Sequence, residues 1–258
     1  MSLVFPHTFV PWFRTVAPHI HAYHGKTFVV GIAGELIAAG KLSAFAQDLS
    51  ILHAMGIKIV LVHGFRPQVN EQLRSKGHEA RYHNGLRITD AVALDSAQEA
   101  AGQLRFEIEA AFSQGLPNTP MANAIVRVVS GNFLTARPVG IVDGVDFMHS
   151  GFVRKVDAAA IRRAIDIGAL LLLSPFGFSP TGEAFNLTME DVATSTAIAV
   201  LVATSSIVRL KASPVGEKPN GDSSTMAPMS MARRIATPST LRTTPLWMKS
   251  TPSTMPTG

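Results

Sequence analysis

The fold of this chain is decided by the stretch His63-Gly64-Phe65-Arg66-Pro67, which lies between an apolar run and an amphipathic segment. The apolar run before it, residues 57–62, is short and rich in β-branched residues, so it predicts a buried strand. The residues after it, 67–75, have the apolar spacing of a helix. A glycine that joins a buried strand directly to a helix is expected in an α/β protein.

Strand–helix alternation continues on both sides of this stretch, over residues 1 to about 202. The expected strands span 27–32, 57–62, 124–129 and 169–173, with strand-and-turn excursions over 132–152. The expected helices span 9–23 (interrupted by Pro11 and Pro18), 36–55, 67–75, 90–112, 158–167 (capped by Asp157) and 190–201. This order predicts a doubly wound, mainly parallel α/β sheet with helices on both faces.

Composition narrows the class of protein. The 258 residues include no cysteine, which excludes disulfides, thiolate metal sites and cysteine nucleophiles. Seven of the Lys and Arg residues and two of the acidic residues follow Ala203, so the net charge of +5 belongs to that end and residues 1–202 are nearly neutral. A nucleic-acid partner is therefore not expected. With no long apolar run and no signal-peptide pattern in residues 1–12, we expect a cytoplasmic protein without a membrane partner.

The segment 203–258 differs from everything before it. Ser, Thr and Pro make up nearly half of it, and it has no apolar periodicity, so it is predicted to be a disordered, low-complexity tail. Two origins remain open: a genuine tail, or a frameshifted reading of what should be the second half of the domain. We favour the frameshift, because the change falls inside an apolar helix that is still unfinished.

Candidate binding residues follow the first two strands. Ligands of doubly wound sheets bind at the carboxyl ends of the strands, where Gly31, Gly34 and Gly64 could admit a phosphate or a carboxylate. These glycines could equally form tight turns only, and spacing alone favours that interpretation.

Arg87, after the Asn84-Gly85 turn, could hold a ligand carboxylate or pair with a neighbouring acid, and both remain open. No metal site is expected, because His19, His21 and His24 do not share a helix face.

Several segments together carry a resemblance to a known family. They are Phe9-Val10-Pro11-Trp12-Phe13-Arg14 with Ala17-Pro18, Gly25-Lys26-Thr27-Phe28-Val29-Val30, Leu61-Val62-His63-Gly64-Phe65-Arg66-Pro67-Gln68-Val69, Asn84-Gly85-Leu86-Arg87-Ile88-Thr89-Asp90 and Phe185-Asn186-Leu187. Over about residues 8–200 the chain resembles the amino acid kinase family, and specifically the N-terminal domain of bacterial N-acetylglutamate synthases. The resemblance implies a three-layer sandwich, incomplete here, over 26–202. It also implies an oligomerisation helix within 1–25.

The chain departs from acetylglutamate kinase, the catalytic relative, at three places. The kinase has Lys-x-Gly-Gly after its first strand, where this chain has Gly31 and Ala33 in place of the lysine and the first glycine. Its second loop is His-Gly-Gly-Gly, where Phe65 and Arg66 bring bulky side chains, and its Asn-x-Asn-x-Asp element ends here in Glu190. The resemblance thus identifies vestigial phosphate-loop positions and no catalytic residue; they are Gly31, Ala33, Gly34, His63, Gly64, Phe65 and Arg66. Arg87 and Asn186 are candidates for holding an acidic ligand.

The resemblance also implies a function for the intact protein. A synthase transfers an acetyl group from acetyl-CoA to glutamate in arginine biosynthesis, and L-arginine inhibits it through the kinase-like domain. We expect that the acetyltransferase domain and the second half of the kinase-like domain are absent here. The chain alone should then need no cofactor, transfer no acetyl group and bind arginine weakly. Alternatives are an acetylglutamate kinase, a non-catalytic arginine-binding subunit, or the product of a damaged reading frame.

Overall fold

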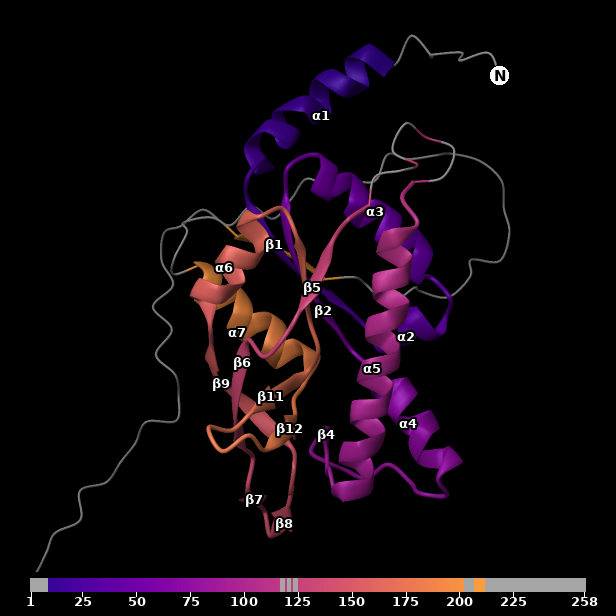
Figure 1. Ribbon diagram of the computed structural model, residues 1–258, viewed down its shortest axis with the longest axis vertical. Coiled ribbons are helices and arrows are strands. Elements are labelled where there is room, and N and C mark those ends of the chain that lie inside the picture. The colour runs from indigo at the N-terminus through magenta and orange to yellow at the C-terminus, as the bar shows by residue number, and fades with distance from the viewer. Residues whose placement is uncertain (1–8, 117–118, 120–121, 123–124, 202–206, 212–258) are drawn as a thin grey trace, which may run out of the picture. The chain divides into compact units, whose positions relative to one another are not determined.

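A five-stranded parallel sheet forms the centre of the molecule. The computed structural model describes residues 9–116, 119, 122, 125–201 and 207–211 (Figure 1). The sheet has the order β13-β1-β2-β10-β5, and every neighbouring pair is parallel. Its strands are β1 (Thr27–Ile32), β2 (Lys58–His63), β5 (Val128–Ser130), β10 (Leu170–Leu173) and β13 (Ile207–Lys211). The predicted parallel sheet is confirmed.

Helices cover both faces of this sheet, as predicted (Figure 1). Alternate residues of one strand point to opposite faces, so Phe28, Val30 and Ile32 of β1 join one apolar cluster and Val29 joins the other. The first cluster lies under α2 (Gly34–Ala38), α3 (Leu42–Ala54), α4 (Arg66–Ser75) and α5 (Ala91–Ser113). The second lies under α6 (Ala158–Asp166) and α7 (Met189–Leu201). Strands buried on both faces explain why 57–62 and 169–173 are almost wholly apolar.

A second, four-stranded sheet has the order β12-β11-β6-β9. It consists of β6 (Leu134–Pro138), β9 (Gly151–Val156), β11 (Phe176–Phe178) and β12 (Ala184–Asn186). Two short hairpins accompany it, β3 (Tyr82–His83) with β4 (Leu86–Arg87), and β7 (Ile141–Val142) with β8 (Val145–Asp146). The predicted excursions over 132–152 correspond to β6 through β9. The short strands β11 and β12 were not predicted.

Two of the helix predictions were wrong in detail. The segment 36–55 forms two helices, α2 and α3, because Gly40 between them adopts a left-handed backbone with φ of 70°. In contrast, α1 (Phe9–Tyr23) is continuous through both prolines. Pro11 lies in its first turn, where no backbone N–H is needed for a helical hydrogen bond.

The strand β13 lies inside the segment that was predicted to be a tail. Residues Ile207–Lys211 pair in parallel with Thr27–Gly31 of β1, so the boundary at residue 203 was wrong for these five residues. The error has a physical reason. Single-sequence periodicity over five residues is weak, whereas the edge of β1 offers a complete ladder of backbone donors and acceptors. The rest of the predicted tail, 212–258, lies outside the described residues.

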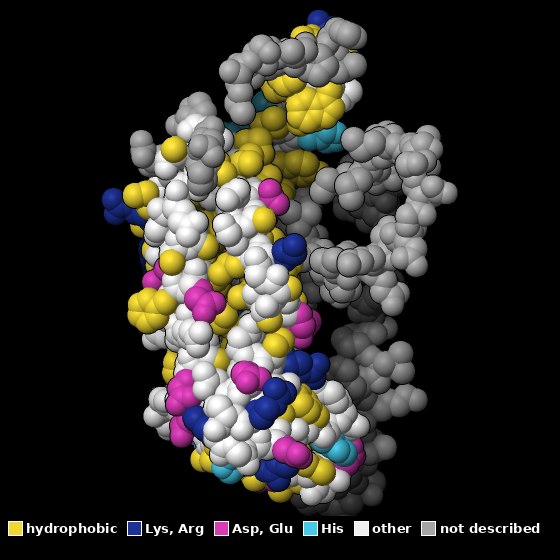
Figure 2. Space-filling model, turned by 90° about the vertical axis from the view of Figure 1, so that its right-hand side faces the viewer, with side chains coloured by type: hydrophobic (Ala, Val, Ile, Leu, Met, Phe, Trp, Pro, Cys, Tyr) yellow, Lys and Arg dark blue, Asp and Glu magenta, His cyan; other side chains and the backbone are white. Residues whose placement is uncertain are grey.

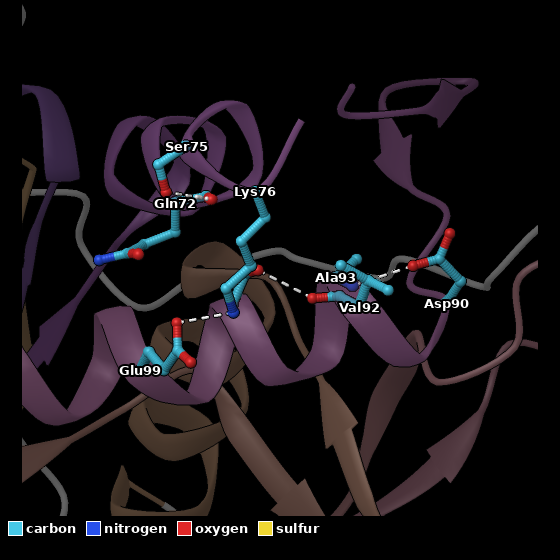
Figure 3. A network of polar contacts seen from close by, with 8 residues as sticks. Gln72, Ser75, Lys76, Asp90, Val92, Ala93 and Glu99 are labelled. Atoms are coloured by element: carbon cyan, nitrogen blue, oxygen red, sulfur yellow. Dashed lines mark hydrogen bonds and ion pairs between the residues drawn. The ribbon is translucent and has the colours of Figure 1, made fainter. Parts of the chain in front are cut away.

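Aspartates cap two of the helices: Asp157, as predicted, and Asp90, which was predicted only as the first residue of its helix. Asp90 accepts a hydrogen bond from the backbone N–H of Ala93 at the start of α5, and Asp157 accepts one from Ala160 at the start of α6. Farther along α5, an ion pair of 2.8 Å joins Glu99 Oε2 to Lys76 Nζ, just after α4 (Figure 3). On the face that α4 and α5 line, side chains of both charges are interspersed (Figure 2). Within the described residues, none of the helices is long and apolar enough to cross a membrane.

Candidate functional site

A cavity of about 360 Å³ opens at the carboxyl ends of β1 and β2. It brings together the loops after these strands, the β3–β4 hairpin, the end of β12 and the first turn of α7. Seven of the predicted site residues line it: Ala33, Gly34, Gly64, Phe65, Arg66, Arg87 and Asn186. Gly31 and His63 are not among the lining residues; they lie in β1 and β2, below the cavity.

The backbones at Gly34 and Gly64 lie close together: a Cβ on Gly34 would lie 3.1 Å from the carbonyl oxygen of Gly64, and one on Gly64 would lie 3.2 Å from the backbone nitrogen of Gly34. The N–H of Gly64 donates to the carbonyl of Ile32 at 2.8 Å. A Cβ on Gly34 would lie 2.7 Å from Gln68 Oε1 and 2.9 Å from Pro67 Cδ. A side chain at position 34 would therefore force Gln68 and Pro67 to shift, so close packing favours glycine here. The interpretation of these glycines as tight-turn residues is therefore sufficient on geometry.

A methionine side chain fills the space above the glycines. A Cβ on Gly31 would lie 3.5 Å from Met189 Cε, and one on Gly64 would lie 3.4 Å from Met189 Sδ. Met189 is the first residue of α7. A thioether offers no hydrogen-bond donor to an anion. The floor between the two glycine loops is therefore apolar.

Phe65 and His63 are core residues. Phe65 was expected to project into the phosphate space, but it is 5% exposed and its ring packs on Phe176 with centroids 5.6 Å apart. Phe65 therefore borders the cavity but does not fill it. His63 is fully buried, and its Nε2 lies 2.8 Å from Ser174 Oγ. Burial lowers the pKa of His63 to about 4, so the ring is neutral at physiological pH.

Arg87 is a buried cation at the cavity wall, 8% exposed. Its Nη2 donates to Asn70 Oδ1 at 2.7 Å and to the carbonyl of Arg66 at 3.4 Å, while its buried Nη1 has no partner. No carboxylate among the described residues pairs with it, so the interpretation as a surface ion pair was wrong. Burial lowers the pKa of Arg87; the contact with Tyr82 opposes this shift, and the positive charge of Arg66 adds to it.

A chain of buried hydrogen bonds connects Asn186 to the backbone of Arg87. Asn186 Nδ2 donates to Thr89 Oγ1 at 3.1 Å, and Thr89 Oγ1 lies 2.7 Å from Ser150 Oγ. Ser150 Oγ in turn donates to the carbonyl of Arg87. Since each hydroxyl has one proton, this order makes Thr89 the donor to Ser150. The chain fixes the backbone that carries the buried guanidinium.

The first turn of α7 is acidic. Glu190 lines the cavity, and Asp191 accepts hydrogen bonds from Val153 N at 2.8 Å and Ser195 Oγ at 3.1 Å. Negative charge at this position already complements the positive end of the helix dipole. This helix start is thus unfavourable for a phosphate. Among the described residues, no group of three His, Asp or Glu side chains is placed to hold a metal ion.

Sequence reasoning missed two neighbours of Arg87, Asn70 and Tyr82, which had recognisable signals. Asn70 stands four residues after Arg66 and so shares its helix face. Tyr82 lies opposite Arg87 across the Asn84-Gly85 turn, a pairing that a two-residue hairpin loop predicts. Met189, Thr89 and Ser150 carried no such local signal, because their partners are distant in sequence.

Comparison of the sequence with protein families and with known proteins identifies its relatives. Residues 26–209 match the model of the amino acid kinase family. Amino-acid acetyltransferases are similar to this chain: that of Ralstonia nicotianae is 61% identical over 192 residues, 74% of this chain and 43% of the relative. That of Azotobacter vinelandii is 48% identical over 190 residues, 74% of this chain and 44% of the relative. The chain therefore spans less than half the length of these relatives.

Comparison with solved structures also identifies an acetyltransferase. N-acetylglutamate synthase from Neisseria gonorrhoeae, complexed with coenzyme A and L-arginine, is 38% identical with a TM-score of 0.73. The match covers 83% of this chain and 50% of the synthase chain. The synthase from the same organism has also been solved with coenzyme A and N-acetyl-glutamate, with a TM-score of 0.69 to this chain.

Proposed function

Because the chain belongs to the amino acid kinase family, we propose that it is the kinase-like part of an amino-acid acetyltransferase, an N-acetylglutamate synthase of arginine biosynthesis. The whole protein would transfer an acetyl group from acetyl-CoA to glutamate in the cytoplasm. Since the aligned region is less than half of the curated relatives, acetyl transfer is proposed for the whole protein and not for residues 9–211. In this part, the cavity is proposed to bind an acidic ligand.

The buried guanidinium of Arg87 carries the proposal of an acidic ligand. A buried charge is costly unless it is paired, and Nη1 of Arg87 has no partner in the described part of the chain. A ligand carboxylate in the cavity would supply the missing acceptor, and a guanidinium can bind it with two parallel hydrogen bonds. Asn70 already occupies Nη2 and so fixes the plane of the group. Glutamate and N-acetylglutamate have the required carboxylate.

Phosphoryl transfer is disfavoured by the same cavity. No lysine is present among the described residues that line it, and Gly31 stands where the kinase relatives have one. Met189 fills the space between the glycine loops, and Glu190 with Asp191 opposes an anion at the start of α7. We therefore expect no ADP release when the chain is mixed with ATP and N-acetylglutamate. Steady ADP release would support the acetylglutamate kinase alternative.

We further propose L-arginine as the effector of the whole protein, since a synthase structure similar to this chain holds it. Its binding to this chain alone is expected to be weak.

A homo-oligomer formed through α1 is also proposed, because α1 buries none of its residues and leaves Trp12 57% exposed and Phe13 46% exposed.

Calorimetry with N-acetylglutamate tests the acidic-ligand proposal. We expect the chain to bind it, and Arg87→Gln to weaken binding by about ten- to a hundredfold, because a charge-assisted hydrogen bond is lost. Arg74→Gln removes the same charge from an exposed position outside the cavity and should leave affinity unchanged. Circular dichroism would verify that each variant is folded. Absence of binding by the unmodified chain would refute the proposal.

A further inference from the structure

Arg66 follows β2 closely, at a position where the kinase relatives have a glycine. It starts α4 and lines the same cavity as Arg87. Its Nη2 donates to the carbonyl of Gly85 at 3.2 Å, and its guanidinium carbon lies 4.7 Å from the centroid of the Tyr82 ring. A hydrogen bond and a cation–π contact therefore hold this side chain in place, although it is exposed.

The same tyrosine holds both cations. The guanidinium carbon of Arg87 lies 4.9 Å from the Tyr82 centroid, and the Tyr82 hydroxyl donates to Asn70 Oδ1 at 2.9 Å. Arg87 Nη2 donates to that same Asn70 oxygen and to the carbonyl of Arg66. Two positive charges are thus fixed side by side around one ring. Their mutual repulsion is unfavourable, and a ligand with two negative charges would relieve it.

No acidic side chain among the described residues forms an ion pair with these two arginines. The acidic residues that line the cavity are Glu35 and Glu190, which belong to the first turns of α2 and α7. Neither forms an ion pair with Arg66 or Arg87 in the described part of the chain. The end of the cavity formed by α4 and the β3–β4 hairpin is therefore cationic.

We propose that Arg66 and Arg87 form a two-cation site for a dicarboxylate of amino-acid size. Arg87 binds one carboxylate inside the cavity, and Arg66 binds the second at its mouth. This inference rests on the proposed function, and it makes Arg66 the residue that selects dicarboxylates over monocarboxylates. A ligand with a cationic side chain, such as L-arginine, is disfavoured at this end by repulsion from Arg66.

The test compares N-acetylglutamate with N-acetylglutamine, which replaces one carboxylate by an amide of the same shape. An exposed ion pair changes an equilibrium by up to about fivefold, so the unmodified chain should prefer N-acetylglutamate by about three- to fivefold at low salt. Arg66→Gln should remove this preference while retaining affinity for N-acetylglutamine. Arg66→Lys keeps the charge and should keep the preference. Arg87→Gln should weaken both ligands.

Arg74→Gln, on the same helix but outside the cavity, is the matched control and should behave as the unmodified chain does. If folded Arg66→Gln still prefers N-acetylglutamate, the two-cation site is refuted while the acidic-ligand function stands. If the unmodified chain binds both ligands equally, the same conclusion holds. If it binds neither, the proposed function itself is refuted and the inference with it.

Discussion

His63 shows how one buried side chain makes stability depend on pH. Its ring is enclosed at the end of β2, and burial holds its pKa at about 4 in the folded protein against 6.5 in the unfolded chain. Between these values the unfolded chain binds the proton more readily, so the free energy of unfolding rises with pH. The stabilisation is complete above about pH 6.5 and is lost as the pH falls towards 4.

We therefore expect the free energy of unfolding to fall by about 2–3 kcal/mol between pH 7 and pH 4.5, through His63. His63→Gln keeps a polar group beside Ser174 but does not titrate, so its decrease over this range should be smaller by that amount. Urea denaturation at the two pH values measures both proteins. Equal decreases in the two proteins would contradict the assignment to His63.

Among the site residues, sequence reasoning succeeded where a local turn fixes the position. Arg87 was a candidate because it follows the Asn84-Gly85 turn, and it does line the cavity. Phe65 was misjudged because its burial depends on Phe176, a residue more than a hundred positions away. Sequence spacing gives the direction in which a side chain leaves the backbone, but it does not give what that side chain meets.

Among the helices, two glycines have opposite effects on the stability of the fold. Gly34 lies at the start of α2, where a Cβ would lie 2.7 Å from Gln68 Oε1. Gly102 lies in the interior of α5, where a Cβ would meet nothing within 4 Å. The first glycine permits close approach of two loops, whereas the second only increases the conformational freedom of the unfolded chain.

Alanine at these positions should have opposite effects. Gly34→Ala forces Gln68 and Pro67 to move, so it should lower the free energy of unfolding by about 1–3 kcal/mol. Gly102→Ala should raise it by about 0.5–1 kcal/mol. Thermal unfolding followed by circular dichroism measures both variants. A Gly34→Ala variant as stable as the unmodified chain would show that the two loops can separate without cost.

The predicted boundaries of the helices were accurate where the local sequence signal is strong. The cap at Asp157 was predicted and is confirmed, since its side chain accepts a hydrogen bond from a backbone N–H three residues ahead. Asp90 was predicted as the first residue of its helix, and the structure shows that it caps that helix in the same way. The division of 36–55 into α2 and α3 was missed, because the apolar spacing continues through the break at Gly40. A single residue with positive φ ends a helix without changing the hydrophobic pattern around it.

For the whole molecule, the assembly proposal gives a measurable outcome. Replacing both Trp12 and Phe13 by serine removes exposed aromatic surface from α1. We expect the unmodified chain to sediment as a species well above its monomer mass of 27.5 kDa, and the double variant to be smaller. Ile167→Ser, which removes an exposed apolar side chain next to α6, should not change the mass. A monomeric unmodified chain would refute the oligomer.

The parallel sheet, the helices on both of its faces and the family could all be predicted from the sequence, because they follow from hydrophobic periodicity and from motifs a few residues long. The nature of the cavity, in contrast, follows from tertiary packing. Only folding brings Asn186 to Thr89, 97 residues apart, and places Met189 over the glycines. Folding also buries Arg87 with no acidic partner among the described residues. The physical reason is that the desolvation and pairing of a charge depend on which distant segments pack around it, and local sequence does not encode those neighbours.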